Sequence, residues 1–125
     1  MSLRSPLGRA RGLGSAKDGV HHFWVQRLSA LALIPLSLWL VFSLAQLSGS
    51  GFGPVAWWVS APPVAVTLVL FIAAAFYHSS LGLQVVIEDY VASEGRKLAL
   101  LVLVKFSHLL LATGAIFAVL KVALT

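Results

Sequence analysis

The chain has 125 residues, of which 59% are hydrophobic and only 10% are charged, whereas about a quarter of the residues in a soluble domain carry a charge. It has no cysteine, which excludes disulfide bonds, thiolate zinc sites, cysteine-bound iron–sulfur clusters and covalently attached c-type haem. The formal net charge is +5, but the basic residues gather ahead of the first apolar block. Membrane topology and contact with anionic lipid explain them better than a nucleic-acid partner does.

Residues 1–27 are predicted to form a basic arm that ends at the membrane interface. Residues 1–20 are rich in Gly, Ser and Arg, show no apolar periodicity, and lack the apolar region and cleavage site of a signal peptide. His21, His22 and Arg27 lie at the end of the arm. A guanidinium in this position can clamp a carboxylate such as a haem propionate, although it can equally be a residue that sets topology.

Three apolar blocks follow, at about residues 28–47, 64–87 and 98–120, and each is long enough to cross a hydrocarbon core of about 30 Å. They predict an all-α integral membrane domain over residues 28–125, with three transmembrane helices. Pro35 lies inside the first block and is expected to kink that helix.

The charges between the blocks predict which side of the membrane each loop occupies. The first connecting segment, residues 48–58, carries no charge, whereas the second, residues 88–97, carries Arg96 and Lys97 beside three acids. Positive residues favour the inner side of a membrane. We therefore expect the N-terminus and the second loop inside, and the first loop and the C-terminus outside.

The second block contains the most informative residue of the chain, His78. It lies about ten residues from the inner edge of its span, so it is about 15 Å deep and close to the midplane. Polar groups at that depth are costly and usually functional, and imidazole is the usual axial ligand of a b-type haem. Gly82, one turn later, would leave room for a flat macrocycle. The spacing is equally compatible with a histidine that only hydrogen-bonds a neighbouring helix.

The third block contains two polar residues, Lys105 and His108. His108 is also about ten residues from the inner end of its span, so a haem held between His78 and His108 of one chain is geometrically open. Alternatively, Lys105 and His108 lie on one helix face and form a polar stripe towards another subunit. We favour the stripe.

The second block ends in Asp89 and Tyr90 at the inner interface. Asp89 lies on nearly the same helix face as His78 and about 16 Å further along the axis. A phenol hydroxyl can donate a hydrogen bond to a quinone carbonyl, and a nearby carboxylate can orient that donor or relay a proton. In the alternative interpretation, which is the commoner one for a tyrosine taken alone, Tyr90 is an interfacial aromatic residue and the acids form a solvated helix end.

Taken together, these motifs resemble the hydrophobic membrane anchors of succinate dehydrogenase (respiratory complex II), of the type known as the small cytochrome b anchor. The matching segments are Gly19-Val20-His21-His22-Phe23 with Arg27 before the first span, and Tyr77-His78, Leu81-Gly82 and Asp89-Tyr90 along the second. The resemblance covers the whole chain, because the number of spans and the expected inside N-terminus also agree with it.

The resemblance implies that His78 is the axial ligand of haem b, while a sister membrane anchor of the same enzyme supplies the opposite ligand and packs with this chain in a helical bundle. It also implies that Tyr90, supported by Asp89, contacts the ubiquinone headgroup, and that Arg27 and His21 lie near the haem propionates. An iron–sulfur subunit and a flavoprotein subunit would bind on the inner side of the membrane.

The implied function is to anchor succinate dehydrogenase, an enzyme of the citric acid cycle and the electron transport chain. The chain alone would be inert towards succinate. The lack of a long presequence favours a bacterial inner membrane over a mitochondrial one. The resemblance assigns no role to His22, Lys105 or His108. The alternatives are an anchor of a quinol:fumarate reductase, another b-type cytochrome subunit, and a small ion-conducting subunit that uses Lys105, His108 and His78 as a proton path.

Overall fold

The computed structural model describes residues 5–10 and 18–125, and the regular secondary structure within them is entirely helical. The helices are α1 (Pro6–Ala10), α2 (Asp18–Gln46), α3 (Phe52–Ser60), α4 (Pro62–Tyr90) and α5 (Glu94–Leu124). This confirms the predicted all-α class. Parts of the predicted basic arm, at residues 1–4 and 11–17, lie outside the described residues.

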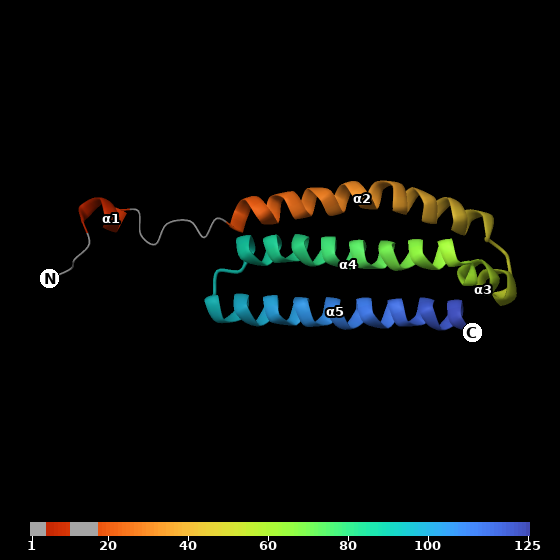
Figure 1. The fold of residues 1–125 in the computed structure, drawn as a ribbon. Coiled ribbons are helices and arrows are strands. Elements are labelled where there is room, and N and C mark those ends of the chain that lie inside the picture. Colours follow the sequence, from red (N-terminus) through yellow and green to blue (C-terminus); the bar gives the residue numbers. More distant parts are fainter. Residues whose placement is uncertain (1–4, 11–17) are drawn as a thin grey trace.

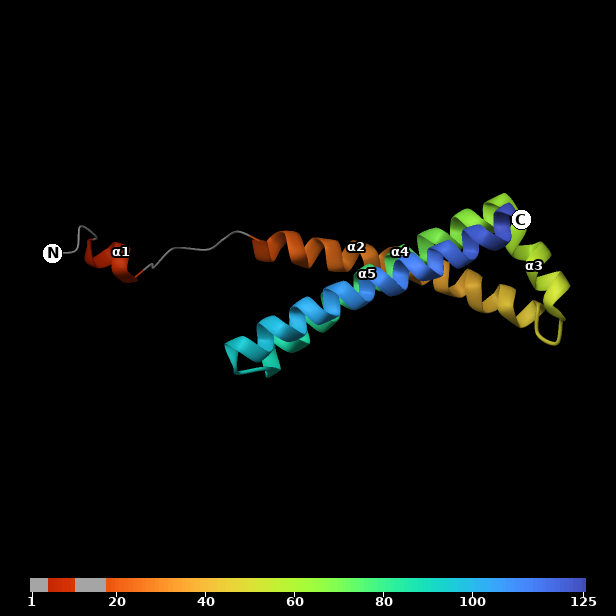
Figure 2. The same ribbon diagram turned by 90° about the horizontal axis from the view of Figure 1, so that it is seen from below.

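The three long helices lie side by side, with α4 in the middle (Figure 1). α4 packs against both α2 and α5, whereas α2 and α5 are not neighbours within the described part of the chain. Seen from below, α2 crosses the antiparallel α4–α5 pair obliquely (Figure 2). Because α4 touches both other helices, it is the element that can bring residues of α2 and α5 into one site.

Three helices are long and apolar enough to cross a membrane, at Gly19–Gln46, Pro62–Tyr90 and Glu94–Leu124. This confirms the number and the order of the predicted spans. A helix of 29 residues, such as α4, is about 44 Å long. It therefore exceeds a hydrocarbon core of about 30 Å, so its ends reach the headgroup regions or the helix tilts.

Prolines mark the start of α4 but do not end α2. α4 begins with Pro62 and Pro63, where a missing backbone N–H breaks no helical hydrogen bond. Pro35 lies inside α2, which continues through it and follows a curved path in Figure 1. The kink that we expected at Pro35 is therefore a bend in α2, and the helix is not interrupted.

The first connecting segment, predicted as a loop over residues 48–58, is partly helical. A turn with a positive φ of 80° at Gly49 is followed by the short helix α3. Helix α3 lies at the end of the helix layer (Figure 1), and its Trp58 stacks on Trp39 of α2 with ring centroids 5.7 Å apart. Burial of these aromatic rings stabilises a segment whose glycines and proline alone favour a turn.

Very little of the described chain is buried. The buried hydrophobic residues are Ala65, Leu68 and Ile87, all on α4, while large apolar side chains on every long helix are exposed. Monomeric soluble proteins rarely expose such large contiguous apolar surfaces. Lipid and other protein helices are therefore the natural surroundings of this fold.

Candidate haem-binding and quinone-binding residues

His78 lies on α4 and faces α2. Its side chain is half-buried, and its Nδ1 atom lies 3.0 Å from the Oγ atom of Ser29 on α2. No hydrogen bond to its Nε2 atom occurs among the described residues. The ring is therefore held on one side by the chain itself, while its second nitrogen remains available to a group from outside.

Gly82 leaves open space on the surface of α4, one helical turn from His78. Residues four apart lie on the same face of a helix. A Cβ atom added to Gly82 would meet no heavy atom of this chain within 4 Å. The sequence-based prediction of free space beside the imidazole thus agrees with the structure.

His108 has partners for both of its ring nitrogens. Its Nδ1 atom lies 2.9 Å from the carbonyl oxygen of Val104, and its Nε2 atom lies 3.2 Å from the Oγ atom of Ser79. A carbonyl only accepts hydrogen bonds, so Nδ1 carries the proton and Nε2 accepts the hydroxyl proton of Ser79. Phe76 adds an edge-to-face contact, with ring centroids 5.9 Å apart.

The histidines of α4 and α5 therefore connect different pairs of helices. His78 bonds from α4 to α2, whereas His108 bonds from α5 to Ser79 on α4. Consecutive residues such as His78 and Ser79 point about 100° apart around a helix. The residue spacing allowed a haem bound between His78 and His108 of the same chain. This arrangement does not support that possibility, because both ring nitrogens of His108 already have hydrogen-bond partners.

If His78 is the haem ligand that the motifs imply, His108→Ala should leave the haem content of the purified protein unchanged. The substitution removes an interhelical hydrogen bond and an aromatic contact, at a cost of about 1 kcal/mol. The purified complex should therefore melt at a slightly lower temperature while its haem absorbance per complex remains that of the unaltered protein. Loss of the haem together with His108 would show instead that this ring is a ligand.

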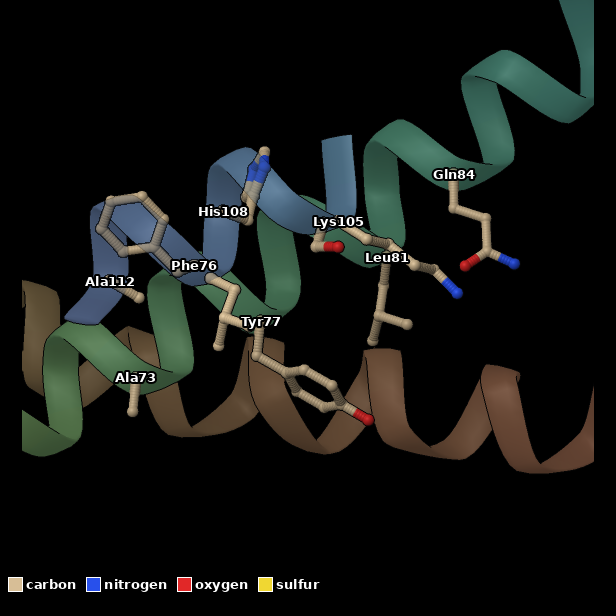
Figure 3. A pocket seen from close by; sticks show the side chains of 10 residues that line it. Ala73, Phe76, Tyr77, Leu81, Gln84, Lys105, His108 and Ala112 are labelled. Atoms are coloured by element: carbon tan, nitrogen blue, oxygen red, sulfur yellow. The ribbon is translucent and has the colours of Figure 1, made fainter. Parts of the chain in front are cut away.

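The predicted polar stripe lines an open groove between α4 and α5. The groove has a volume of about 460 Å³. Lys105 and His108 belong to its α5 wall, and Figure 3 shows the Lys105 side chain extended towards Gln84 of α4. The groove is lined by Ala73, Phe76, Tyr77, Ser80, Leu81, Gln84, Lys105, His108, Leu109 and Ala112. Lys105 and His108 thus share one surface, and its contact with another subunit stays a prediction.

The C-terminal end of α4 carries Asp89 and Tyr90 at the surface of the described chain. Both are exposed, and 85% of the Tyr90 surface is accessible. No hydrogen bond joins the two side chains or ties Tyr90 to another described residue. The nearest acid with a partner is Glu88, whose Oε1 atom accepts a hydrogen bond of 2.8 Å from Gln84. The phenol of Tyr90 is therefore free to contact a molecule that this chain does not supply.

The first turns of α2 carry the remaining predicted residues. Arg27 is exposed, and its guanidinium lies 4.9 Å from the ring centre of Phe23. Within the described ranges, the only ion pair joins Lys97 to Glu94, so Arg27 has no carboxylate partner there. His21 is exposed, whereas the Nε2 atom of His22 is buried without a hydrogen-bond partner among the described residues.

Ser29, the partner of His78, was not among the residues predicted for the site. The apolar pattern did not point to it, because a span that starts at residue 28 places Ser29 at the membrane edge, whereas the structure begins α2 ten residues earlier. Ser29 lies eleven residues after the start of α2 at Asp18, and His78 lies twelve residues before the end of α4 at Tyr90. Since α2 and α4 are antiparallel neighbours, these counts place both residues at about the same depth.

Comparison with known proteins identifies the family. The family model for the succinate dehydrogenase/fumarate reductase transmembrane subunit matches residues 1–121. The chain is 34% identical over 117 residues to the succinate dehydrogenase hydrophobic membrane anchor subunit of Rickettsia bellii, with 94% of each chain covered. It is 29% identical over 124 residues to the protein of the same name from Paracoccus denitrificans, with 99% of this chain and 95% of the relative covered. No solved structure matches the chain.

These matches agree with the resemblance inferred from the motifs. The relatives from Rickettsia and Paracoccus and the three helices able to cross a bilayer indicate a multi-pass protein of a bacterial inner membrane. The match covers nearly the whole chain, so it includes the first two spans, most of the third and the residues ahead of them. The chain belongs to the succinate dehydrogenase/fumarate reductase transmembrane subunit family.

Proposed function

We propose that this chain anchors succinate dehydrogenase in the membrane, supplies His78 as one axial ligand of haem b, and contributes Tyr90 to the ubiquinone site. The observation that carries this proposal is the arrangement of His78 on α4. Its Nδ1 atom is bonded to Ser29, no described residue engages its Nε2 atom, and Gly82 leaves the neighbouring surface clear. His78 lies twelve residues before the C-terminal end of α4, and Tyr90 is the last residue of that helix.

The residues of this chain fit a b-type haem. The described residues contain no group of three or more His, Cys, Asp or Glu side chains that could hold a metal ion. An axial site of a b-type haem needs only one imidazole from each side, because the porphyrin supplies the other iron ligands. When bound, the haem supplies a one-electron carrier in the low-dielectric interior. A sister membrane anchor would supply the second imidazole.

Arg27 is the residue of this chain that we assign to a haem propionate, with His21 nearby. It lies two residues before Ser29 on α2, the helix against which His78 packs. Its guanidinium is exposed and free of any described carboxylate, so it can donate a bidentate pair of hydrogen bonds to a carboxylate. Lysine at this position would offer only a point charge.

We expect Arg27→Ala to weaken haem binding without abolishing it. Loss of a charge-assisted hydrogen bond costs about 1.5–3 kcal/mol, so haem should leave the purified complex at least about 10-fold faster. Transfer of haem to apomyoglobin measures this rate. Arg27→Lys should recover part of the stability, and Arg96→Ala, at an exposed position on α5, should have no effect. Equal rates for Arg27→Ala and Arg96→Ala would remove Arg27 from the site.

The quinone role of Tyr90 and Asp89 follows from their position and chemistry. The exposed phenol can donate a hydrogen bond to a quinone carbonyl, which gains negative charge during reduction. Asp89 lies beside it at the same interface and can pass protons from the inner solution. Ubiquinone would enter laterally from the bilayer, and its headgroup would stop at this polar helix end.

Partner proteins must supply the succinate chemistry. With no cysteine, this chain cannot hold an iron–sulfur cluster through thiolates, and its helices offer no flavin-binding domain. We therefore assign succinate oxidation to a flavoprotein subunit and electron transfer to an iron–sulfur subunit. Both would dock at the inner ends of α2, α4 and α5, where the basic N-terminal residues would also lie.

Purification of the tagged chain from its native membranes tests the proposal. The eluate should contain a flavoprotein, an iron–sulfur protein and a second small anchor, and the dithionite-reduced difference spectrum should show a b-type haem. The complex should reduce ubiquinone with succinate. A tagged chain that is recovered from solubilised membranes without a flavoprotein and a cluster protein would overturn the assignment.

Fumarate reduction is the second candidate, because the matching family model covers the transmembrane subunits of both enzymes. The same preparation distinguishes the two directions. A succinate dehydrogenase should reduce ubiquinone with succinate faster than it reduces fumarate with a quinol. The opposite ratio would assign the chain to a quinol:fumarate reductase.

A further inference from the structure

We propose that Ser29 is a positioning residue for haem: it fixes the tautomer of His78 and aims the Nε2 atom of that ring at the iron. The inference rests on the proposed haem-binding function. It concerns a residue on α2 that does not itself bind the iron. Ser29 acts through the ring of His78, which belongs to α4.

The hydrogen bonds of the Ser29 hydroxyl determine where the imidazole proton lies. Its Oγ atom lies 3.0 Å from the carbonyl oxygen of Gln26 and 3.0 Å from the Nδ1 atom of His78. A carbonyl oxygen can only accept, so the single hydroxyl proton is donated to Gln26. The remaining bond then requires His78 to donate its Nδ1–H to the Ser29 oxygen. The lone pair of the neutral ring is consequently on Nε2, the atom that is free to bind a metal.

His108 provides an internal comparison. Its Nδ1–H donates to the backbone carbonyl of Val104, so the same tautomer is present. The Ser79 hydroxyl, however, has no second bond among the described residues and donates its proton to Nε2. Ser29 thus leaves the Nε2 atom of His78 open, whereas Ser79 occupies the Nε2 atom of His108. This difference separates His78 from His108 as a ligand, although both rings lie at similar depth.

Ser29 also fixes the orientation of the ring. A histidine that binds a metal usually donates its other N–H to an acceptor, which sets the ring plane and raises the basicity of the ligating nitrogen. Here that acceptor lies on a different helix, 49 residues away in the chain. The rotation of the His78 ring therefore depends on the packing of α2 against α4. Changes of such partners commonly reduce metal affinity by about 10- to 100-fold.

The test compares Ser29→Ala with Ser29→Thr and Ser37→Ala in the purified complex. Threonine keeps the hydroxyl, and Ser37 is a second half-buried serine of α2 with no side-chain hydrogen bond among those described. The measurements are the haem content, the rate of haem transfer to apomyoglobin, the midpoint potential and the low-spin electron paramagnetic resonance spectrum of the ferric haem.

Ser29→Ala should assemble, lose haem about 10-fold faster and show altered g values. Its midpoint potential should rise, because an imidazole without an acceptor for Nδ1–H donates less charge and stabilises ferric iron less. Ser29→Thr and Ser37→Ala should match the unaltered complex. If Ser29→Ala fails to assemble, Ser29→Cys, which keeps the size but is a weaker acceptor, should shift the potential in the same direction.

A haem-containing complex in which these variants leave the g values and the potential unchanged would overturn the role of Ser29 while leaving the proposed function intact. An unaltered complex that contains no haem would overturn the proposed function itself. The two failures are therefore distinguishable in one preparation.

Discussion

His78→Ala should remove the haem signal of the assembled enzyme completely. The substitution deletes the single histidine of α4, whose Nε2 atom no described residue engages, and leaves no other imidazole on that helix. Absorbance of the reduced complex in the α-band region, normalised to flavin, measures the loss. The flavoprotein and the iron–sulfur protein should still purify with the tagged chain, since the docking surface that we propose lies at the helix ends, away from His78.

His108→Ala is the matched control for this experiment, because it removes the other membrane-embedded imidazole, whose nitrogens are both occupied. Haem should persist in that variant. A bis-histidine spectrum that survives His78→Ala would contradict the assignment of His78. A spectrum lost in both variants would favour a haem held within this chain.

Tyr90→Phe should reduce kcat/KM for ubiquinone about 100-fold, because removal of one donor to a developing negative charge typically costs this much. Oxidation of succinate with an artificial acceptor that takes electrons ahead of the quinone site should be unchanged. The phenylalanine retains the size and the interfacial character of the ring, so the variant isolates the hydroxyl. Steady-state rates with a soluble ubiquinone analogue measure the effect.

Tyr77→Phe is the matched control, because Tyr77 and Tyr90 are the two tyrosines of the chain. Tyr77 lies on α4 as well, but it lines the groove towards α5 and is distant from the inner helix end. Its substitution should leave the quinone kinetics unaffected. Equal losses from both variants would show that neither hydroxyl has a specific role.

The architecture was largely predictable from the sequence because hydrocarbon thickness sets the length of each apolar block. The number and the order of the spans agree with the structure, and His78 lies well inside α4, but α2 begins at Asp18, ten residues before the predicted first span. The short helix α3 was missed, because its glycines and Pro54 favour a turn, and its stability depends on Trp58 stacking against Trp39 of another helix.

The partners of the histidines were not predictable in the same way. A soluble helix shows its buried face by an apolar stripe, but these spans are apolar on every side, so their rotation leaves little trace in the sequence. Whether His78 meets α2 or α5 depends on how the helices pack. Equal depth gave no clue to Ser29 either, because the first apolar block begins at residue 28, whereas helix α2 begins ten residues earlier at Asp18.

Helix α4 runs without interruption from Pro62 to Tyr90 and carries both the proposed iron ligand and the proposed quinone donor. The helix therefore fixes the distance between His78 and Tyr90 along its axis at about 18 Å, because each residue adds about 1.5 Å. Adding or deleting one residue between them would change this spacing by only about 1.5 Å but would swing the phenol by about 100° around the axis. A substitution between the two residues keeps this geometry, whereas an insertion or a deletion of a single residue would separate the two sites in direction.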